Sequence, residues 1–269
     1  MSVDPSRVAL FIPPGLAKFK LELFERIGRK IIAAGGRTLR HDYNLVRDLP
    51  DDLIPIIGCT PQFRELVLNE WPQRRRQFIF WDRGYLRRVF ATWLPRGTNG
   101  GYYRWTCNAF QMQSVKEVPD DRWRALDIQH CVRPWHKTGK HILVADTGYD
   151  YWDLFSDREW TARTVVQIKK FTDRPIRVRG KEDAKPLFED LRDAHALVTH
   201  GSIAAVESVV MGCPVFVHPF STARLVGKIN IADIECPAYP DREPWLYSLA
   251  YSQFNETELV DGTLFRLMW

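Results

Sequence analysis

The chain has 269 residues, of which 45% are hydrophobic and 26% are charged, and its formal net charge at pH 7 is +5. This composition is ordinary for a globular protein with a real core and excludes a disordered chain. No run approaches the roughly 20 apolar residues of a membrane span, and the N-terminus lacks a signal-peptide pattern, so we expect a cytoplasmic protein with no membrane partner. The five cysteines show no zinc-site spacing.

The charge is divided unevenly along the chain. Residues 1–138 contain 23 Lys and Arg against 14 Asp and Glu, whereas residues 139–269 contain 15 against 19. A basic half favours a polyanionic partner such as nucleic acid or an anionic polysaccharide, because clustered cations raise the local concentration of polyanions. The alternative is a solvated basic surface.

The N-terminal half begins with a β-α pattern. The apolar run Val8–Ile12 predicts a buried strand, and apolar spacings of three and four predict a helix over residues 16–34. Strands are expected at 53–57 and 77–81, with a helix at 62–71 between them. The stretch after these elements is rich in Arg, Trp, Gly and Pro and gives no clear pattern beyond a turn leading into a strand near residue 103.

Regular alternation returns in the C-terminal half. Strands are expected at 141–145, 176–179, 196–199 and 214–217, and helices at 157–171, 184–192 and 203–211. This β-α-β-α-β-α-β order predicts a doubly wound parallel sheet, whose ligands bind at the carboxyl ends of the strands. Two further segments, 245–254 and 256–267, are expected to be helical.

The sequence therefore predicts an α/β protein made of two Rossmann-like domains with a cleft between them. We place the domains at residues 1–138 and 139–269, with the last helices able to pack back on the first domain.

The most informative segment spans residues 197–219. A strand ends at Thr199, and His200, Gly201 and Ser202 then turn into a helix. Gly201 allows a phosphate to approach the backbone, and the helix dipole favours an anion there. Ser202 either caps the helix or donates to a phosphate oxygen, and His200 adds a donor.

Glu207 lies in the middle of that helix among valines. A capping-box glutamate would stand three residues after the cap, where the sequence has Ala205. A carboxylate reaching over a cleft accepts hydrogen bonds from both hydroxyls of a ribose. The alternative is a solvated helix face.

The pattern H-G-S-x-x-x-x-E-S-x-x-x-G-x-P-V resembles the donor-binding segment of GT-B glycosyltransferases, a fold shared with nucleotide-sugar 2-epimerases. The resemblance covers residues 142–219. It implies that the turn at His200 binds the pyrophosphate of a nucleotide-sugar, UDP-linked in our interpretation, and that Glu207 binds the ribose. The resemblance also implies that the first domain binds the acceptor and the second binds the nucleotide-sugar. No cofactor is expected besides this co-substrate. The sequence has no D-x-D motif, which argues against a metal ion at the pyrophosphate.

Further donor contacts are expected on loops and strand ends of the same domain, at Thr147, Gly148, Arg177, Arg179, Ser221 and Thr222. Arg177 and Arg179 occupy alternate positions of one strand, where they would meet phosphates or frame the base. The alternative for both is an ion pair with Glu182 or Asp183.

Glycosyl transfer with inversion needs a base for the acceptor hydroxyl. Our candidate is Asp82, because it directly follows an apolar strand and so belongs at the carboxyl end, facing the cleft. The alternative is an ion pair with Arg83 or Arg87. Asp42 and Asp146 are the next candidates.

Arginines and aromatics interleave in the basic half, a combination that suits phosphate contact and base stacking. Acceptor contacts are predicted at Arg83, Tyr85, Arg87 and Arg104. The combination resembles phage enzymes that glycosylate hydroxymethylated bases, so the leading hypothesis is sugar transfer to a 5-hydroxymethylpyrimidine in phage DNA, inside the bacterial host. The alternatives are a capsular or surface saccharide acceptor, a nucleotide-sugar 2-epimerase, and a non-catalytic nucleic-acid-binding protein.

Overall fold

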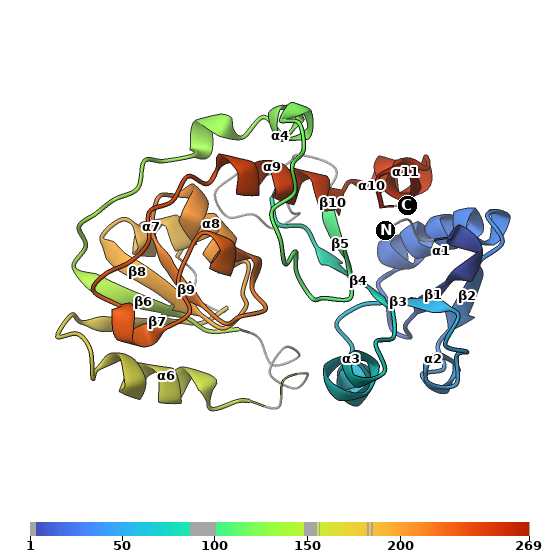
Figure 1. Ribbon diagram of the computed structural model, residues 1–269, viewed down its shortest axis with the longest axis horizontal. Helices are drawn as coiled ribbons and strands as arrows, with labels where there is room; N and C mark the ends of the chain where they lie inside the picture. Colours follow the sequence, from blue (N-terminus) through green and yellow to red (C-terminus); the bar gives the residue numbers. More distant parts are fainter. Residues whose placement is uncertain are drawn as a thin grey trace. The chain divides into compact units, whose positions relative to one another are not determined.

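The computed structural model describes residues 4–86, 101–147, 155, 157–181, 183 and 185–268. The chain divides into two compact units, each with its own sheet (Figure 1). Unit 1 comprises Met1–Gly84, Gly100–Phe110 and Gln253–Trp269, and unit 2 comprises Tyr85–Asn99 and Gln111–Ser252. Helices flank parallel strands in both units, which confirms the predicted fold class of two Rossmann-like domains. No helix in the described part of the chain has the length and apolar character needed to cross a bilayer.

Unit 1 contains a six-stranded sheet in the order β10-β5-β4-β3-β1-β2. Its strands are β1 (Val8–Ile12), β2 (Arg37–Arg40), β3 (Ile54–Ile57), β4 (Ile79–Arg83), β5 (Tyr103–Cys107) and β10 (Gln253–Phe254). Strands β1 to β4 are parallel to one another, whereas β5 runs antiparallel to β4 and to β10. The carboxyl ends of β1 to β4 therefore share one edge of the sheet.

Both faces of this sheet are covered. Its helices are α1 (Lys18–Ala33), α2 (Asn44–Arg47), α3 (Trp71–Gln73), α10 (Glu256–Val260) and α11 (Thr263–Met268). Because side chains alternate along a strand, Leu10 of β1 packs with α1, α10 and α11, while Phe11 packs with the α2 and α3 side. Two apolar cores, one on each face, hold the sheet.

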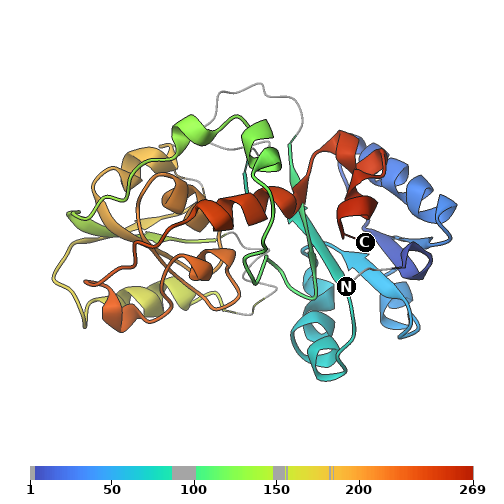
Figure 2. The same ribbon diagram turned by 45° about the horizontal axis from the view of Figure 1, so that its top comes forward.

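Unit 2 contains a four-stranded sheet in the order β7-β6-β8-β9, with all strands parallel. The strands are β6 (His141–Ala145), β7 (Ile176–Arg179), β8 (Ala194–Thr199) and β9 (Val215–Val217). Helix α6 (Trp160–Ile168) covers one face, and α7 (Leu187–Leu191) and α8 (Ala204–Val210) cover the other (Figures 1 and 2). Outside the sheet, α4 (Asp121–Ala125) packs against α9 (Glu243–Tyr251).

Several elements differ from the sequence-based expectation. The helix expected over 62–71 is a short 3₁₀ turn (Pro61–Phe63), a π-helix (Leu66–Glu70) and α3. Pro72 has no N–H to donate to the carbonyl of Leu68, which disfavours a continuous α-helix there.

The two C-terminal helical segments also differ. The helix expected over 245–254 ends at Tyr251, because Gln253 and Phe254 form a strand paired with β5 and Phe254 is fully buried. The helix expected over 256–267 is divided into α10 and α11, which are separated at Gly262, whose φ of 96° is incompatible with a right-handed helix.

Candidate functional site

The order of strands in unit 2 creates a switch point between β6 and β8. From β6 the chain passes to β7 on one side, and it then returns to β8 on the other side. In an open α/β sheet this arrangement leaves a crevice for ligands at the carboxyl ends of the strands. The Thr199 hydroxyl at the end of β8 donates to the Ala145 carbonyl at the end of β6 over 2.7 Å. The two strand ends are thus joined directly beneath the loops that follow them.

The loop after β6 carries the first predicted donor contacts. Thr147 is 9% exposed, its amide donates to the Asp146 carboxylate over 2.7 Å, and its hydroxyl has no hydrogen-bond partner among the described residues. Buried hydroxyl groups in native proteins usually have a partner, so this group is notable at a predicted ligand edge. Gly148, the next predicted contact, lies outside the described residues.

The turn after β8 is buried and tightly held. His200 is 5% exposed and Gly201 is buried, while the Ser202 hydroxyl accepts a hydrogen bond from the Ala204 amide over 3.2 Å. Ser202 thus binds the first amide of α8, whose N-cap position is occupied by Ile203, and its contact with a phosphate stays a prediction. The His200 carbonyl accepts from the His218 amide after β9 over 3.0 Å. The turn is fixed to the neighbouring strand end.

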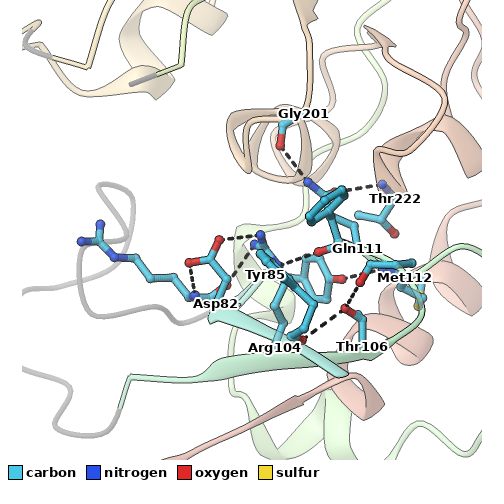
Figure 3. A network of polar contacts seen from close by, with 12 residues as sticks. Asp82, Tyr85, Arg104, Thr106, Gln111, Met112, Gly201 and Thr222 are labelled. Atoms are coloured by element: carbon cyan, nitrogen blue, oxygen red, sulfur yellow. Dashed lines mark hydrogen bonds and ion pairs between the residues drawn. The ribbon is translucent and has the colours of Figure 1, made fainter. Parts of the chain in front are cut away.

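Gln111 joins this turn to the loop after β9 (Figure 3). Its amide nitrogen donates to the Gly201 carbonyl over 2.7 Å, and its amide oxygen accepts from the Thr222 backbone N–H over 2.9 Å. The side chain is 2% exposed. Gln113, two residues later, donates to the Phe220 carbonyl over 2.5 Å. Sequence reasoning missed both glutamines, because they lie in the stretch without a recognisable pattern and a single glutamine carries no positional signal.

The loop after β9 turns its predicted donor contacts inward. Ser221 is 1% exposed, and its hydroxyl accepts from the Ala223 amide over 3.3 Å. Thr222 is fully buried, and its carbonyl and hydroxyl accept from the indole N–H of Trp245 over 3.1 and 3.2 Å. The two side chains hold the loop in shape, and the donor contacts predicted for them stay predictions.

The His200 ring is the centre of an aromatic cluster. It stacks on the His218 ring with centroids 4.3 Å apart, and the rings of Trp160, Phe220 and Phe155 lie within 5.6 Å of it. Burial, aided by His218 and opposed by Asp157, lowers the pKa of His200 to about 3. His200 is therefore neutral at pH 7 and offers an uncharged N–H rather than a cation.

Glu207 is 2% exposed in α8, where Val206 and Val209 are also buried. This burial excludes the solvated helix face considered as the alternative. A buried carboxylate must be hydrogen-bonded or paired, because an isolated one is strongly disfavoured. The ribose contact at Glu207 stays a prediction.

The two arginines of β7 differ in their surroundings. Arg179 forms an ion pair with Asp190 and also donates to the Lys185 carbonyl, while Arg177 is exposed. Both line a pocket of about 480 Å³ that also includes Lys185, Asp183 and Asp190. Arg179 thus pairs with an aspartate on α7 rather than with Asp183, and the pocket carries charges of both signs.

In unit 1, Asp82 lies at the carboxyl end of β4 and pairs with Arg104 of β5. Nη2 of Arg104 is 2.6 Å from Oδ2 of Asp82, and Oδ1 accepts from the Arg83 backbone N–H over 2.7 Å (Figure 3). Arg104 is 5% exposed and also donates to the carbonyls of Arg83 and Phe110. The alternative to a catalytic role was an ion pair with Arg83 or Arg87; the observed pair is with Arg104, which the antiparallel register places directly opposite Asp82.

The remaining predicted acceptor contacts differ in their exposure to solvent. Arg83 is exposed, whereas Tyr85 is 1% exposed and its hydroxyl accepts from the Met112 backbone N–H over 2.7 Å within unit 2. Arg87 lies outside the described residues. Within the described ranges, no three His, Cys, Asp or Glu side chains are grouped so as to hold a metal ion.

Comparison with known proteins gives matches at the level of structure alone. No family model matches the sequence, and no curated protein matches it. Two solved structures from Thermosulfurimonas dismutans are similar over nearly the whole chain. The KpsC beta Kdo 2,7 transferase matches with a TM-score of 0.52 at 10% identity, covering 97% of this chain and 98% of its own. The chain has a GT-B-like fold. The KpsC beta Kdo 2,4 transferase matches with a TM-score of 0.50 at 10% identity, covering 98% of each chain.

Proposed function

We propose that this protein is a glycosyltransferase that moves a sugar from a nucleotide-sugar to a saccharide acceptor. The observation that supports it most is the full-length likeness to two transferases of Kdo. Because one fold can host many activities, the proposed activity also has to be argued from the residues at the strand ends. Unit 2 supplies a switch point with a buried turn and a buried carboxylate at the positions where a nucleotide-sugar is expected.

The donor would lie over the loops after β6 and β8. The backbone of the turn at Gly201 would receive the phosphate, and the neutral N–H of His200 would donate to it. Glu207 would accept hydrogen bonds from the ribose hydroxyls. Thr147 has a buried hydroxyl that lacks a partner among the described residues, which supports a ligand contact on the neighbouring loop.

Asp82 is the proposed base. Its two carboxylate oxygens each accept one hydrogen bond, from Arg104 and from the Arg83 backbone. A carboxylate has about four acceptor positions, so lone pairs remain for the proton of an acceptor hydroxyl. Arg104 would then orient this carboxylate rather than touch the acceptor.

A saccharide acceptor fits the described arginines better than DNA does. Arg74 and Arg76 both pair with Asp51, and Arg104 pairs with Asp82, so three cations of the basic half already have acidic partners. Affinity for DNA depends on cations that neutralise phosphates. The likeness to Kdo transferases also points to sugar polymers and away from bases in DNA.

The first experiment is a thermal-shift screen with UDP, GDP, CMP and ADP conjugates, including CMP-Kdo. A ligand that binds only the folded state raises the unfolding midpoint by mass action. We expect one nucleotide class to stabilise the protein and Glu207→Gln to abolish that shift. Glu189→Gln is the matched control, because Glu189 is an exposed glutamate on the neighbouring helix α7.

The second experiment measures mass increments on acceptors with the nucleotide-sugar found in the screen. An increment on oligosaccharides supports the proposal. An increment on nucleosides of hydroxymethylated DNA, with none on saccharides, would replace the saccharide by DNA. Conversion of the free nucleotide-sugar without any acceptor identifies an epimerase and contradicts the transferase.

A further inference from the structure

A second pocket of unit 2 adjoins the His200 turn described above, because Trp160 and His218 pack against the His200 ring and also line the pocket. It measures about 420 Å³ and lies beside the carboxyl ends of β8 and β9, against the α6 face of the sheet. Its walls include Trp160, Thr164 and Gln167 of α6, His218 after β9, and Ile229 and Asn230. No Lys, Arg, Asp or Glu is among the described residues that line it. The pocket therefore differs from the charged one beside β7.

The rings of Trp160 and His218 line this pocket, and both pack against the His200 ring. The His200 ring lies 4.3 Å from the His218 ring and 5.6 Å from the Trp160 ring, so it packs against both. Burial lowers the pKa of His218, so this ring is neutral at pH 7. Its Nδ1 accepts from the Phe220 amide over 3.4 Å, which leaves the proton of the neutral ring on Nε2.

The polar groups of the pocket are uncharged amides and hydroxyls. Gln167 and Asn230 are exposed at the surface, whereas Thr164 is buried. The side-chain oxygen of Asn230 accepts from the Ala232 amide over 3.1 Å, so its amide nitrogen is the group left to donate. An amide side chain can donate to one hydroxyl and accept from another. Ile229 is 49% exposed although it is a large apolar residue at the pocket wall.

We infer that this pocket binds a neutral pyranose ring. The C–H face of a pyranose packs on aromatic rings such as Trp160 and His218, and its hydroxyls need the amide partners that Gln167 and Asn230 supply. A phosphate or the carboxylate of a sugar acid would find no cation among the described residues of the lining, which disfavours both. The inference deepens the proposed function and rests on it, because the ring belongs to the donor or to the saccharide acceptor.

The test uses methyl glycosides of neutral hexoses as probes of the full-length protein. Saturation-transfer NMR reports which ring protons contact the protein, without nucleotide or turnover. We expect transfer to the C–H face of the neutral glycosides and little transfer to Kdo or to free nucleosides. Trp160→Leu and Gln167→Leu should each weaken glycoside binding about tenfold, since each removes a principal contact.

Matched controls keep the test independent of folding. Phe171→Leu makes the same kind of aromatic-to-leucine change, and Lys169→Leu replaces a long polar side chain, here a charged one, by leucine; both positions are exposed and outside the pocket. Both should leave binding unchanged, and circular dichroism verifies the fold of every variant. Trp160 also packs against the core of unit 2, so its replacement can unfold the protein. In that case the Gln167 variant alone tests the pocket.

The outcomes separate this inference from the proposed function. The inference that the pocket binds a neutral ring is wrong if Gln167→Leu leaves glycoside affinity unchanged, or if Kdo or nucleosides bind in preference to the glycosides. Either result stands even where nucleotide-sugar binding and transfer are intact. Pocket-dependent glycoside binding without any nucleotide binding supports the pocket while the transferase fails. If the intact nucleotide-sugar displaces the glycoside, the ring belongs to the donor, and if both bind together it belongs to the acceptor.

Discussion

Replacing Gln111 by leucine should destabilise unit 2, because Gln111 satisfies two buried backbone groups with one side chain. Leucine has a similar size but leaves the Gly201 carbonyl and the Thr222 N–H without their partner. Gly201 is buried and Thr222 is fully buried, so water does not readily replace the lost bonds. Each unsatisfied buried group costs about 1–3 kcal/mol, so the two together give a loss of about 2–6 kcal/mol and lower the Tm by roughly 4–24 °C.

Calorimetry or denaturant unfolding measures this loss, with Gln129→Leu as the control. Gln129 also lies in unit 2, but its side chain makes one hydrogen bond, to the Trp123 carbonyl, and is only partly buried. Gln111→Leu should therefore cost at least twice as much as Gln129→Leu. Equal effects of the two variants would refute the view that Gln111 holds the turn and the loop together.

Gln111→Glu tests the direction of the two hydrogen bonds. Its carboxylate can still accept from the Thr222 N–H, but it faces the Gly201 carbonyl with an acceptor instead of a donor. The protonated form restores the donor, so folding should raise the pKa of this introduced carboxyl. Stability should be nearest to that of Gln111 at low pH, below the ordinary glutamate pKa of about 4.3, and fall as pH rises through the raised pKa. A loss that does not depend on pH contradicts the assignment of the amide nitrogen to Gly201.

Three further predictions concern other residues. Arg104→Met leaves Asp82 without its ion-pair partner and should lower the kcat of transfer with little change in nucleotide affinity, as measured by steady-state kinetics and by thermal shift. Arg124→Met, which removes an exposed ion pair at α4, is the control, and equal losses of activity in the two variants would contradict a positioning role for Arg104. The depressed pKa of His200, about 3 when folded, predicts stability that is fully present above the ordinary histidine pKa near 6.5 and declines as pH falls toward 3, a dependence that His200→Phe should reduce in acid titrations followed by fluorescence. Burial raises the pKa of the Cys213 thiol to about 12, so mass-mapped alkylation of the native protein should modify exposed Cys59, Cys107 and Cys236 and leave Cys213 intact until unfolding.

The sequence predicted the parts of the fold that are encoded locally. Strands β1, β6, β8 and β9 are buried on both faces, so each reads as an apolar run, and the intervening helices repeat at the expected spacing. Strand β2 was missed because Leu39 is its one buried residue, which leaves no apolar run to detect. Strand β10 exists through pairing with β5, about 150 residues away in sequence, and no local pattern encodes that partner.

The same distinction applies to the candidate site. The placement of His200 after a strand and of Glu207 in the following helix was predicted because both stand at fixed offsets in the β-α pattern, while their binding roles stay predictions. The partner of Asp82 was missed because the expected arginines were near in sequence, whereas Arg104 reaches it through antiparallel register. Ser221 caps the following 3₁₀ turn through a local bond from the Ala223 amide. The inward orientation of Thr222 depends on Trp245, and thus on tertiary packing that the β-α alternation does not specify.

Gln111 shows why a motif alone does not make a binding site. Residues 197–219 determine that a turn follows β8, but the Gln111 and Gln113 side chains fix where the carbonyls of Gly201 and Phe220 point. A loop held in one geometry before ligand arrives spends less free energy on ordering when it binds. A chain that kept the motif and lost Gln111 would retain the four-stranded sheet and lose part of that preorganisation. If the His200 turn binds a phosphate as proposed, its affinity would therefore depend on a segment outside the alternating pattern that reveals the turn.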